Sequence, residues 1–345
     1  MTTTNSNLAS VARWIVILAG AWYLLQELAV VLKPLFLAVL CAYVILPAYF
    51  HIRTRLPKNF SLVFVVTITV LTVYLFAALI QSIISTLREE LPTMIMQLRQ
   101  ITEQFATFVE SKSPKMGRNI RDLIHLEQKG GESANVRLKE LATLVADIIL
   151  NALIVGLYLV FILIEAGKFP TRVAGAFSID YSDKIMDTLR GINQGIANFL
   201  TAKVKSSFLL ALPVAILFSA VGVRSALVWA ALTFFCNFVP YVGSLVGFGI
   251  PGLFAFLQLG ATWEAFGVVI ILLAVHIASA SFLEPRIIGK AVGVSPLVIL
   301  LALSFWGTCW GLAGMLLAVP FTVILKIIFQ HVEGTQPIAK IMSDQ

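Results

Sequence analysis

The chain has 345 residues, of which 59% are hydrophobic and only 12% are charged, and its formal net charge is +7. Soluble domains carry about 25% charged residues, so this composition excludes a water-soluble globular protein and indicates a polytopic membrane protein. The basic residues lie mostly in short loops beside apolar segments and form no dense stripe interleaved with aromatic residues, which argues against nucleic-acid binding.

The first three apolar segments predict three membrane spans, because a helix needs about 20 apolar residues to cross a bilayer. They run over residues 13–33, 34–50 and 60–86, and the short link between the first two predicts a hairpin. The loop between the second and third spans holds three basic residues. The positive-inside rule therefore places this loop and the N-terminus in the cytoplasm.

Residues 87–143 predict an amphipathic helical insert outside the membrane. Its first helix, 87–109, has apolar residues three or four positions apart, which places one apolar stripe on a polar helix. Such a stripe packs on a neighbouring subunit or on the membrane surface, or it caps the spans. The sequence leaves these alternatives open.

A fourth span at 144–164 leads to an amphipathic cytoplasmic stretch at 165–205, and a fifth span follows at 206–223. The next apolar segment, 225–259, would be about 50 Å long as one helix, which is too long for one upright span. "PYVGSLVG" interrupts its middle. A hairpin at this break keeps the basic loop 284–290 inside, whereas one kinked crossing would place that loop outside, so the positive-inside rule favours the hairpin.

A second interrupted segment follows the seventh apolar segment at 265–283. Residues 296–329 again measure about 50 Å as one helix, and "WGTCWGLAG" breaks them in the middle. A hairpin here returns the C-terminus to the cytoplasm, and the two hairpins then enter the membrane from opposite faces. Paired broken helices of this kind are typical of secondary transporters with a solute site near the membrane midplane.

The sequence therefore predicts an all-α polytopic membrane protein with about eight hydrophobic segments, two of them broken. We expect an N-terminal three-span segment at 1–86, the helical insert at 87–143, a transport core at 144–330 and a C-terminal tail at 331–345.

The candidate site residues lie at the two breaks and around the seventh segment. Non-helical backbone at membrane depth survives only beside protein or a water-filled cavity, where its free polar groups can meet an ion or a solute. Ionisable residues inside spans are costly and thus functional candidates, and histidine, here His276, is the residue type used in proton relays and pH sensors. The candidates for solute or ion binding, or for gating, are Asn237, Pro240, Gly243, Gly247, His276, Glu284, Arg286, Gly307, Gly311 and Gly314.

Structural roles compete with these functional ones. Gly243 and Gly247 lie four residues apart, as small residues do in close helix contacts. A hydrogen bond to a facing helix would account equally well for His276. Glu284 and Arg286 either pair with each other or bind an ion.

Enzyme and metal motifs are missing from the sequence. It has no G-x-x-x-x-G-K-[ST], H-E-x-x-H or G-x-S-x-G motif, so we expect no enzyme activity, no ATP-driven pumping and no cofactor. The three cysteines are far apart within apolar segments, which predicts neither a disulfide nor a metal site.

Three stretches of the second half carry a family likeness: "NFVPYVGS" at 237–244, "EPRIIGKAVGVSPLVILLAL" at 284–303 and "GLAGMLLAVPFTVILK" at 311–326. They resemble the autoinducer-2 exporter family of bacterial membrane proteins, which the first half matches only in hydropathy. The family's characteristic positions, carried over by motif, are Pro240, Gly243, Pro285, Gly289, Pro296, Gly311, Gly314 and Pro320.

This resemblance implies secondary transport in the bacterial inner membrane. The expected substrate is a small polar solute such as autoinducer-2, or Na⁺ or Li⁺ exchanged for protons. The expected partners are membrane lipid and further copies of the chain in a homo-oligomer such as a pentamer. A passive channel and a non-transporting membrane scaffold are the alternatives; the broken segments and His276 favour transport over a scaffold, and nothing in the sequence separates a carrier from a channel.

Overall fold

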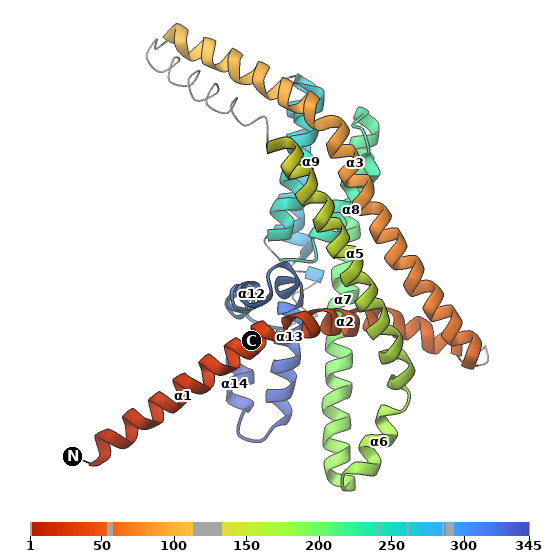
Figure 1. The fold of residues 1–345 in the computed structure, drawn as a ribbon, viewed down its shortest axis with the longest axis vertical. Coiled ribbons are helices and arrows are strands. Elements are labelled where there is room, and N and C mark those ends of the chain that lie inside the picture. The colour runs from red at the N-terminus through yellow and green to blue at the C-terminus, as the bar shows by residue number, and fades with distance from the viewer. Residues whose placement is uncertain are drawn as a thin grey trace. The chain divides into compact units, whose positions relative to one another are not determined.

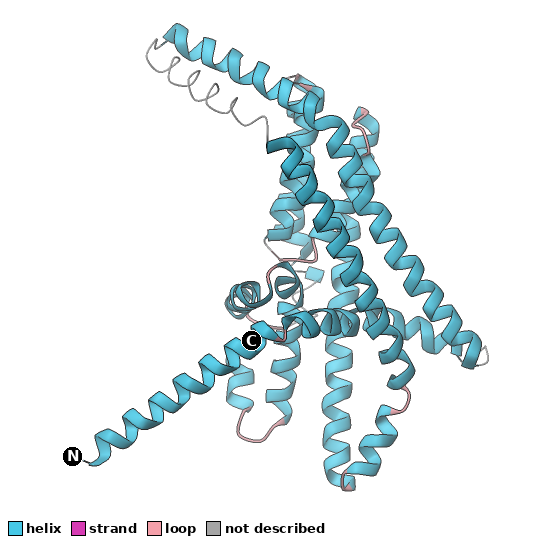
Figure 2. Ribbon diagram, in the orientation of Figure 1, coloured by secondary structure: helices cyan, strands magenta, loops and turns pink. Residues whose placement is uncertain are grey.

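The computed structural model describes residues 2–53, 58–112, 133–240, 242–260, 262–284, 286–287 and 293–344. Within these ranges every regular element is a helix, and extended backbone pairs only at an isolated bridge between Val294 and Ser343 (Figure 2). The all-α prediction is confirmed. The chain forms two compact units: the first comprises Met1–Val70, Ala152–Thr201 and Gly289–Gln345, and the second comprises Leu71–Asn151 and Ala202–Ile288.

The first two helices bend sharply at Leu28. α1 (Thr2–Glu27) and α2 (Ala29–Arg53) differ in direction by 72° at this residue. The bend thus lies before the predicted link near Pro34, and the return of the two helices to the same side of the membrane stays a prediction. A proline is tolerated inside a membrane helix when neighbouring groups satisfy the carbonyl that it frees, so Pro34 does not end α2.

Three further helices continue through boundaries that hydropathy predicts. α3 (Lys58–Lys112) is one helix of 55 residues with Pro92 inside, and it joins the predicted third span to the predicted insert. α5 (Ser133–Ala166) contains the fourth span, and the short α6 (Phe169–Ala176) follows it. α7 (Ile179–Val221) then joins the predicted cytoplasmic stretch to the fifth span, as Figure 1 traces in chain order.

The first broken segment is a helical hairpin in the second unit. α8 (Ala226–Cys236) and α9 (Val242–Leu259) are joined by a short turn. Trp229 packs on Phe254 with ring centroids 4.5 Å apart, and the Thr233 hydroxyl donates to the Gly247 carbonyl at 2.7 Å. Later residues of α8 contact earlier residues of α9, so the two helices are antiparallel, as the predicted hairpin requires.

The second broken segment forms another hairpin, in the first unit. α12 (Pro296–Trp310) and α13 (Leu312–His331) meet at Gly311, whose φ of 65° is a conformation that favours glycine. Trp310 on α12 packs on Phe321 of α13, and α14 (Gln336–Ile341) closes the chain. The two helices pair as the predicted hairpin requires, and the return of each hairpin to the side on which it began stays a prediction. Entry of the two hairpins from opposite membrane faces stays a prediction.

Three helices of the described part are long and apolar enough to cross a membrane: α7, α13, and α10 (Trp263–Ala278) together with the π-helical turn η2 (Ser279–Leu283). Two bent pairs, α1–α2 and α5–α6, would add two spans. α8 is only about 16 Å long at 1.5 Å per residue, about half of a bilayer core. A short helix of this kind fits a hairpin that turns within the membrane.

Candidate functional site

The site begins on the buried side of α7. Leu210, Val214 and Phe218 lie four residues apart and are buried, as expected for one face of a helix. The same face continues towards the N-terminus with Ser207, Ser206 and Lys203, which are also buried. Lys203 is only 2% exposed, although lysine is almost never fully buried without a partner.

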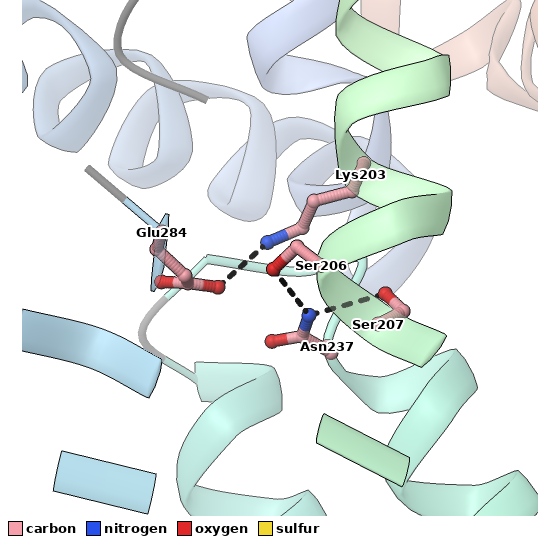
Figure 3. A network of polar contacts seen from close by, with 5 residues as sticks. All are labelled: Lys203, Ser206, Ser207, Asn237 and Glu284. Atoms are coloured by element: carbon pink, nitrogen blue, oxygen red, sulfur yellow. Dashed lines mark hydrogen bonds and ion pairs between the residues drawn. The ribbon is translucent and has the colours of Figure 1, made fainter. Parts of the chain in front are cut away.

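Glu284 provides that partner. Lys203 Nζ donates a hydrogen bond to Glu284 Oε1 at 3.1 Å, and the Glu284 side chain is 26% exposed (Figure 3). Glu284 directly follows η2, whose extra residue per turn changes the direction in which the next side chain points. Single π-helical turns of this kind occur frequently at functional sites. The ion pair keeps the buried ammonium from being left uncompensated.

Asn237 joins the same group from the turn after α8. Its Nδ2 donates to Ser207 Oγ at 3.1 Å and lies 3.5 Å from Ser206 Oγ (Figure 3). The residue is 1% exposed, and its Oδ1 has no hydrogen-bond partner among the described residues. We call this atom the free amide oxygen. The other polar atom of the same side chain, Nδ2, does have hydrogen-bond partners.

These contacts make one polar cluster in the second unit, consisting of Lys203, Ser206, Ser207, Asn237 and Glu284. The cluster combines a lysine–glutamate ion pair, two hydroxyl groups that both donate and accept, and the free amide oxygen. Its net charge is zero when both ionic partners are charged. Such a group can bind a small polar molecule without burying additional charge.

The structure brings two predicted site residues, Asn237 and Glu284, into the cluster. His276 stacks instead on Phe248 of α9, with ring centroids 5.3 Å apart. Arg286 is exposed, and Glu284 pairs with Lys203 and not with Arg286. Pro285 and Gly289 lie outside the described residues.

The predicted glycines and Pro240 lie at turns and close helix contacts. A Cβ on Gly243 would collide with the Cys236 carbonyl, and one on Gly247 would come within 3.3 Å of Thr233. Pro240 lies in the α8–α9 turn, where the Cys236 carbonyl accepts from the Val239 N–H at 3.0 Å. The carbonyl freed by the proline is therefore satisfied.

Three glycines shape the α12–α13 hairpin in the same way. Gly311 forms its turn, a Cβ on Gly314 would collide with the Trp306 carbonyl, and one on Gly307 would come within 3.0 Å of Met315. These contacts agree with the packing role that competes with a functional role for each glycine.

Sequence reasoning missed Lys203, Ser206 and Ser207. It assigned Lys203 to a cytoplasmic stretch, because residues 165–205 are amphipathic and carry more basic than acidic residues. The available signal was the helical period: Lys203, Ser207, Leu210 and Val214 are spaced by four, three and four residues and therefore share one face. A lysine in register with a buried stripe is a candidate site residue.

A family profile described as AI-2E family transporter matches residues 12–334. The chain belongs to this family. The AI-2 transport protein TqsA of Escherichia coli K12 is 28% identical over 336 residues, which are 96% of this chain and 93% of TqsA. A Haemophilus influenzae protein is 26% identical over 357 residues, covering 99% of this chain and 97% of that protein.

Membership in the AI-2E family confirms the resemblance inferred from the three motifs. The family assignment identifies the chain as a transporter, and its apolar helices agree with a membrane location. The polar cluster thus belongs to a transporter, and its residues lie on or directly beside apolar helices.

Proposed function

We propose that this AI-2E family member is a secondary transporter of a small polar solute and that the polar cluster is part of its solute path. The observation that carries the proposal is the buried Lys203–Glu284 pair beside the free amide oxygen of Asn237. Ionisable residues inside membrane spans are costly, face the protein interior or a water-filled cavity, and mark solute or ion pathways. A purely structural helix contact would be satisfied by apolar residues.

An uncharged solute rich in hydroxyl groups fits the cluster best. A hydroxyl can donate to the free amide oxygen and accept from the Lys203 ammonium, and the neutral ion pair does not require a charged ligand. The name of the relative TqsA supports autoinducer-2 as the first solute to test. The sequence has no phosphate-binding loop, so we expect an ion gradient to drive export.

Exchange of Na⁺ or Li⁺ for protons is the second candidate. The Glu284 carboxylate and the Asn237 amide oxygen are oxygen ligands of the kind that hard cations take. Such a cation would have to compete with the Lys203 ammonium, which already holds Glu284 Oε1. This competition makes a cation the less favoured ligand.

Transport by the purified protein in vesicles tests the proposal. Autoinducer-2, Na⁺ and Li⁺ are offered in turn with and without a proton gradient, and we expect saturable, gradient-dependent uptake of autoinducer-2. Lys203→Met should abolish this uptake, whereas Lys184→Met, which removes an exposed lysine, should leave it unchanged. Flux that neither saturates nor responds to the gradient would indicate a passive pore instead.

We further propose that the transporter lies in the bacterial inner membrane as a homo-oligomer with both termini in the cytoplasm. Exposed apolar residues on several helices suit contact with lipid or with neighbouring subunits. Native mass spectrometry in detergent would reveal the number of subunits, and a monomer would contradict this part of the proposal.

A further inference from the structure

Among the described residues, the polar cluster contains a buried cation with one acceptor, Glu284, and a buried acceptor without a donor, the free amide oxygen of Asn237. We infer that the free amide oxygen of Asn237 is a second acceptor for the Lys203 ammonium, which alternates between Glu284 and Asn237. This inference rests on the proposed function of the cluster in transport, which it deepens, but its test does not require transport.

The position of Ser206 indicates that the Lys203 ammonium and the Asn237 side-chain amide lie close together. Ser206 lies almost one helical turn after Lys203 on α7, and its Oγ is 3.5 Å from Asn237 Nδ2. In Figure 3 the Ser206 hydroxyl lies between the Lys203 ammonium and the Asn237 amide, and the free amide oxygen points to the side on which Glu284 lies. A lysine has a flexible four-carbon stem and three donors, so its ammonium can change acceptors while its backbone stays in place.

Glu284 is the member of the ion pair that can move away. Its side chain is 26% exposed, against 2% for Lys203, so it can exchange its partner for water or for a proton. It also follows the π-helical turn η2. Conversion of this turn to a regular helical turn would shift the register by one residue and rotate Glu284 by about 100° around the helix axis.

Lys203 cannot follow Glu284 into solvent, because it lies on the buried face of α7. An uncompensated buried charge is strongly unfavourable, so the ammonium needs another acceptor when Glu284 leaves or becomes neutral. The free amide oxygen of Asn237 provides that acceptor. It is otherwise a buried polar atom without a role, and each such atom costs free energy while it stays unpaired.

The alternation couples Glu284 to the first hairpin. Asn237 begins the turn between α8 and α9, and its Nδ2 is already bound to α7 through Ser207. Transfer of the ammonium to Asn237 therefore tightens the contact between α7 and this turn at the moment when Glu284 is released. Return of the ammonium reverses both changes. This is a two-state element of the kind that a carrier needs to respond to its ligand.

A thermal-unfolding cycle in detergent tests the inference. The variants are Glu284→Leu, Asn237→Leu and the double variant, each also made with Lys203→Met. With Lys203 present, we expect the double variant to lower Tm by at least about 3 °C more than the sum of the single changes, because the ammonium then has no acceptor. With Lys203→Met the effects should add. Additive effects in the presence of Lys203, or the same excess in its absence, would overturn the inference.

A rescue variant keeps the test decisive if Asn237→Leu does not fold. Asn237→Asp offers the ammonium a carboxylate in place of the amide, so it should raise the Tm of Glu284→Leu towards that of the unchanged protein. No rise would contradict the alternation. The matched control is Glu333→Leu, which removes the exposed partner of Lys184 and leaves Glu284 in place, so Asn237→Asp should not raise its Tm. If the expected non-additive Tm change is observed but the protein transports none of the solutes offered, only the proposed function is contradicted.

Discussion

At the residue scale, two lysine–glutamate pairs show that solvent exposure decides how much an ion pair contributes to stability. Lys203–Glu284 and Lys184–Glu333 have N–O distances of 3.1 and 3.2 Å. The second pair is 71% and 89% exposed, so water competes with it and the pair contributes little. In the first pair the lysine is 2% exposed, and loss of its partner leaves a buried charge.

We therefore expect an asymmetric response when the buried pair is broken. Lys203→Met fills the same space with an apolar side chain and leaves Glu284 access to water, so it should change stability by about 1 kcal/mol or less. Glu284→Leu should destabilise more, towards the about 3–5 kcal/mol expected for an uncompensated buried charge and less to the extent that Asn237 accepts the ammonium. Thermal unfolding measures both variants.

The exposed pair supplies the control for this asymmetry. Lys184→Met and Glu333→Leu should each shift stability by about 0.5 kcal/mol or less, because surface substitutions seldom do more. Equal losses for Lys203→Met and Glu284→Leu would show that burial of the ammonium does not dominate the energetics of the pair.

At the element scale, the two hairpins could be predicted from the sequence and the cluster could not. A long apolar segment with proline and glycine in its middle must turn or kink, so length and composition point to the hairpins. A lysine before an apolar segment ordinarily extends to the membrane interface. The fold brings Glu284 to Lys203 and Asn237 to the neighbouring serines of α7, and one sequence does not reveal which helices meet.

Glycine contacts within the first hairpin give the next prediction. Gly243→Ala places a Cβ against the Cys236 backbone carbonyl, which cannot move without opening the hairpin turn. Gly249, on the same helix, has no atom within 4 Å of an added Cβ among the described residues. Gly243→Ala should therefore lower Tm and the yield of folded protein in detergent, whereas Gly249→Ala should be neutral or slightly stabilising. Equal behaviour of the two variants would contradict close packing at Gly243.

The open end of the second hairpin is held by the C-terminal residues. Ser295 N–H donates to the Met342 carbonyl at 2.9 Å, just before α12 begins. The Gly293 carbonyl accepts from Lys326 Nζ at 2.6 Å and from Asp344 N–H at 3.3 Å. The turn at Gly311 and this contact thus close the α12–α13 hairpin at both ends.

Removal of residues 342–345 should loosen that hairpin. Loss of the hydrogen bonds from Ser295 to Met342 and from Asp344 to Gly293 frees the segment before α12, so we expect faster proteolysis near Gly293 and a Tm lower by a few degrees, since each bond contributes about 1 kcal/mol. Lys340→Ala alters an exposed residue of α14 and serves as the control. Unchanged proteolysis after truncation would show that the C-terminal residues do not hold this end.

At the scale of the whole molecule, single helices of the structure join segments that hydropathy predicts to be separate. α3 and α7 each join a predicted span to a predicted extramembrane stretch without a break. The reason is physical: a helix satisfies its own backbone hydrogen bonds and can continue from lipid into water, whereas hydropathy changes at the membrane boundary. Hydropathy therefore locates the bilayer along a helix and not the end of that helix.

The path of the chain through the membrane gives the last prediction. If both broken segments are hairpins that turn back within the membrane, Arg224 and Glu264 face the extracellular side and Lys290 faces the cytoplasm. Lys290 is not among the residues that the structure describes. With Cys41, Cys236 and Cys309 replaced by serine or alanine, single cysteines at positions 224 and 264 should react with an impermeant maleimide on intact cells. A cysteine at 290 should react only after the membrane is permeabilised.

Reaction of position 290 on intact cells would mean that residues 225–259 cross the membrane once, because a single crossing reverses the side of every later loop. Label at 224 but not at 264 would lead to the same conclusion independently, since a hairpin between them must return to the side on which it began.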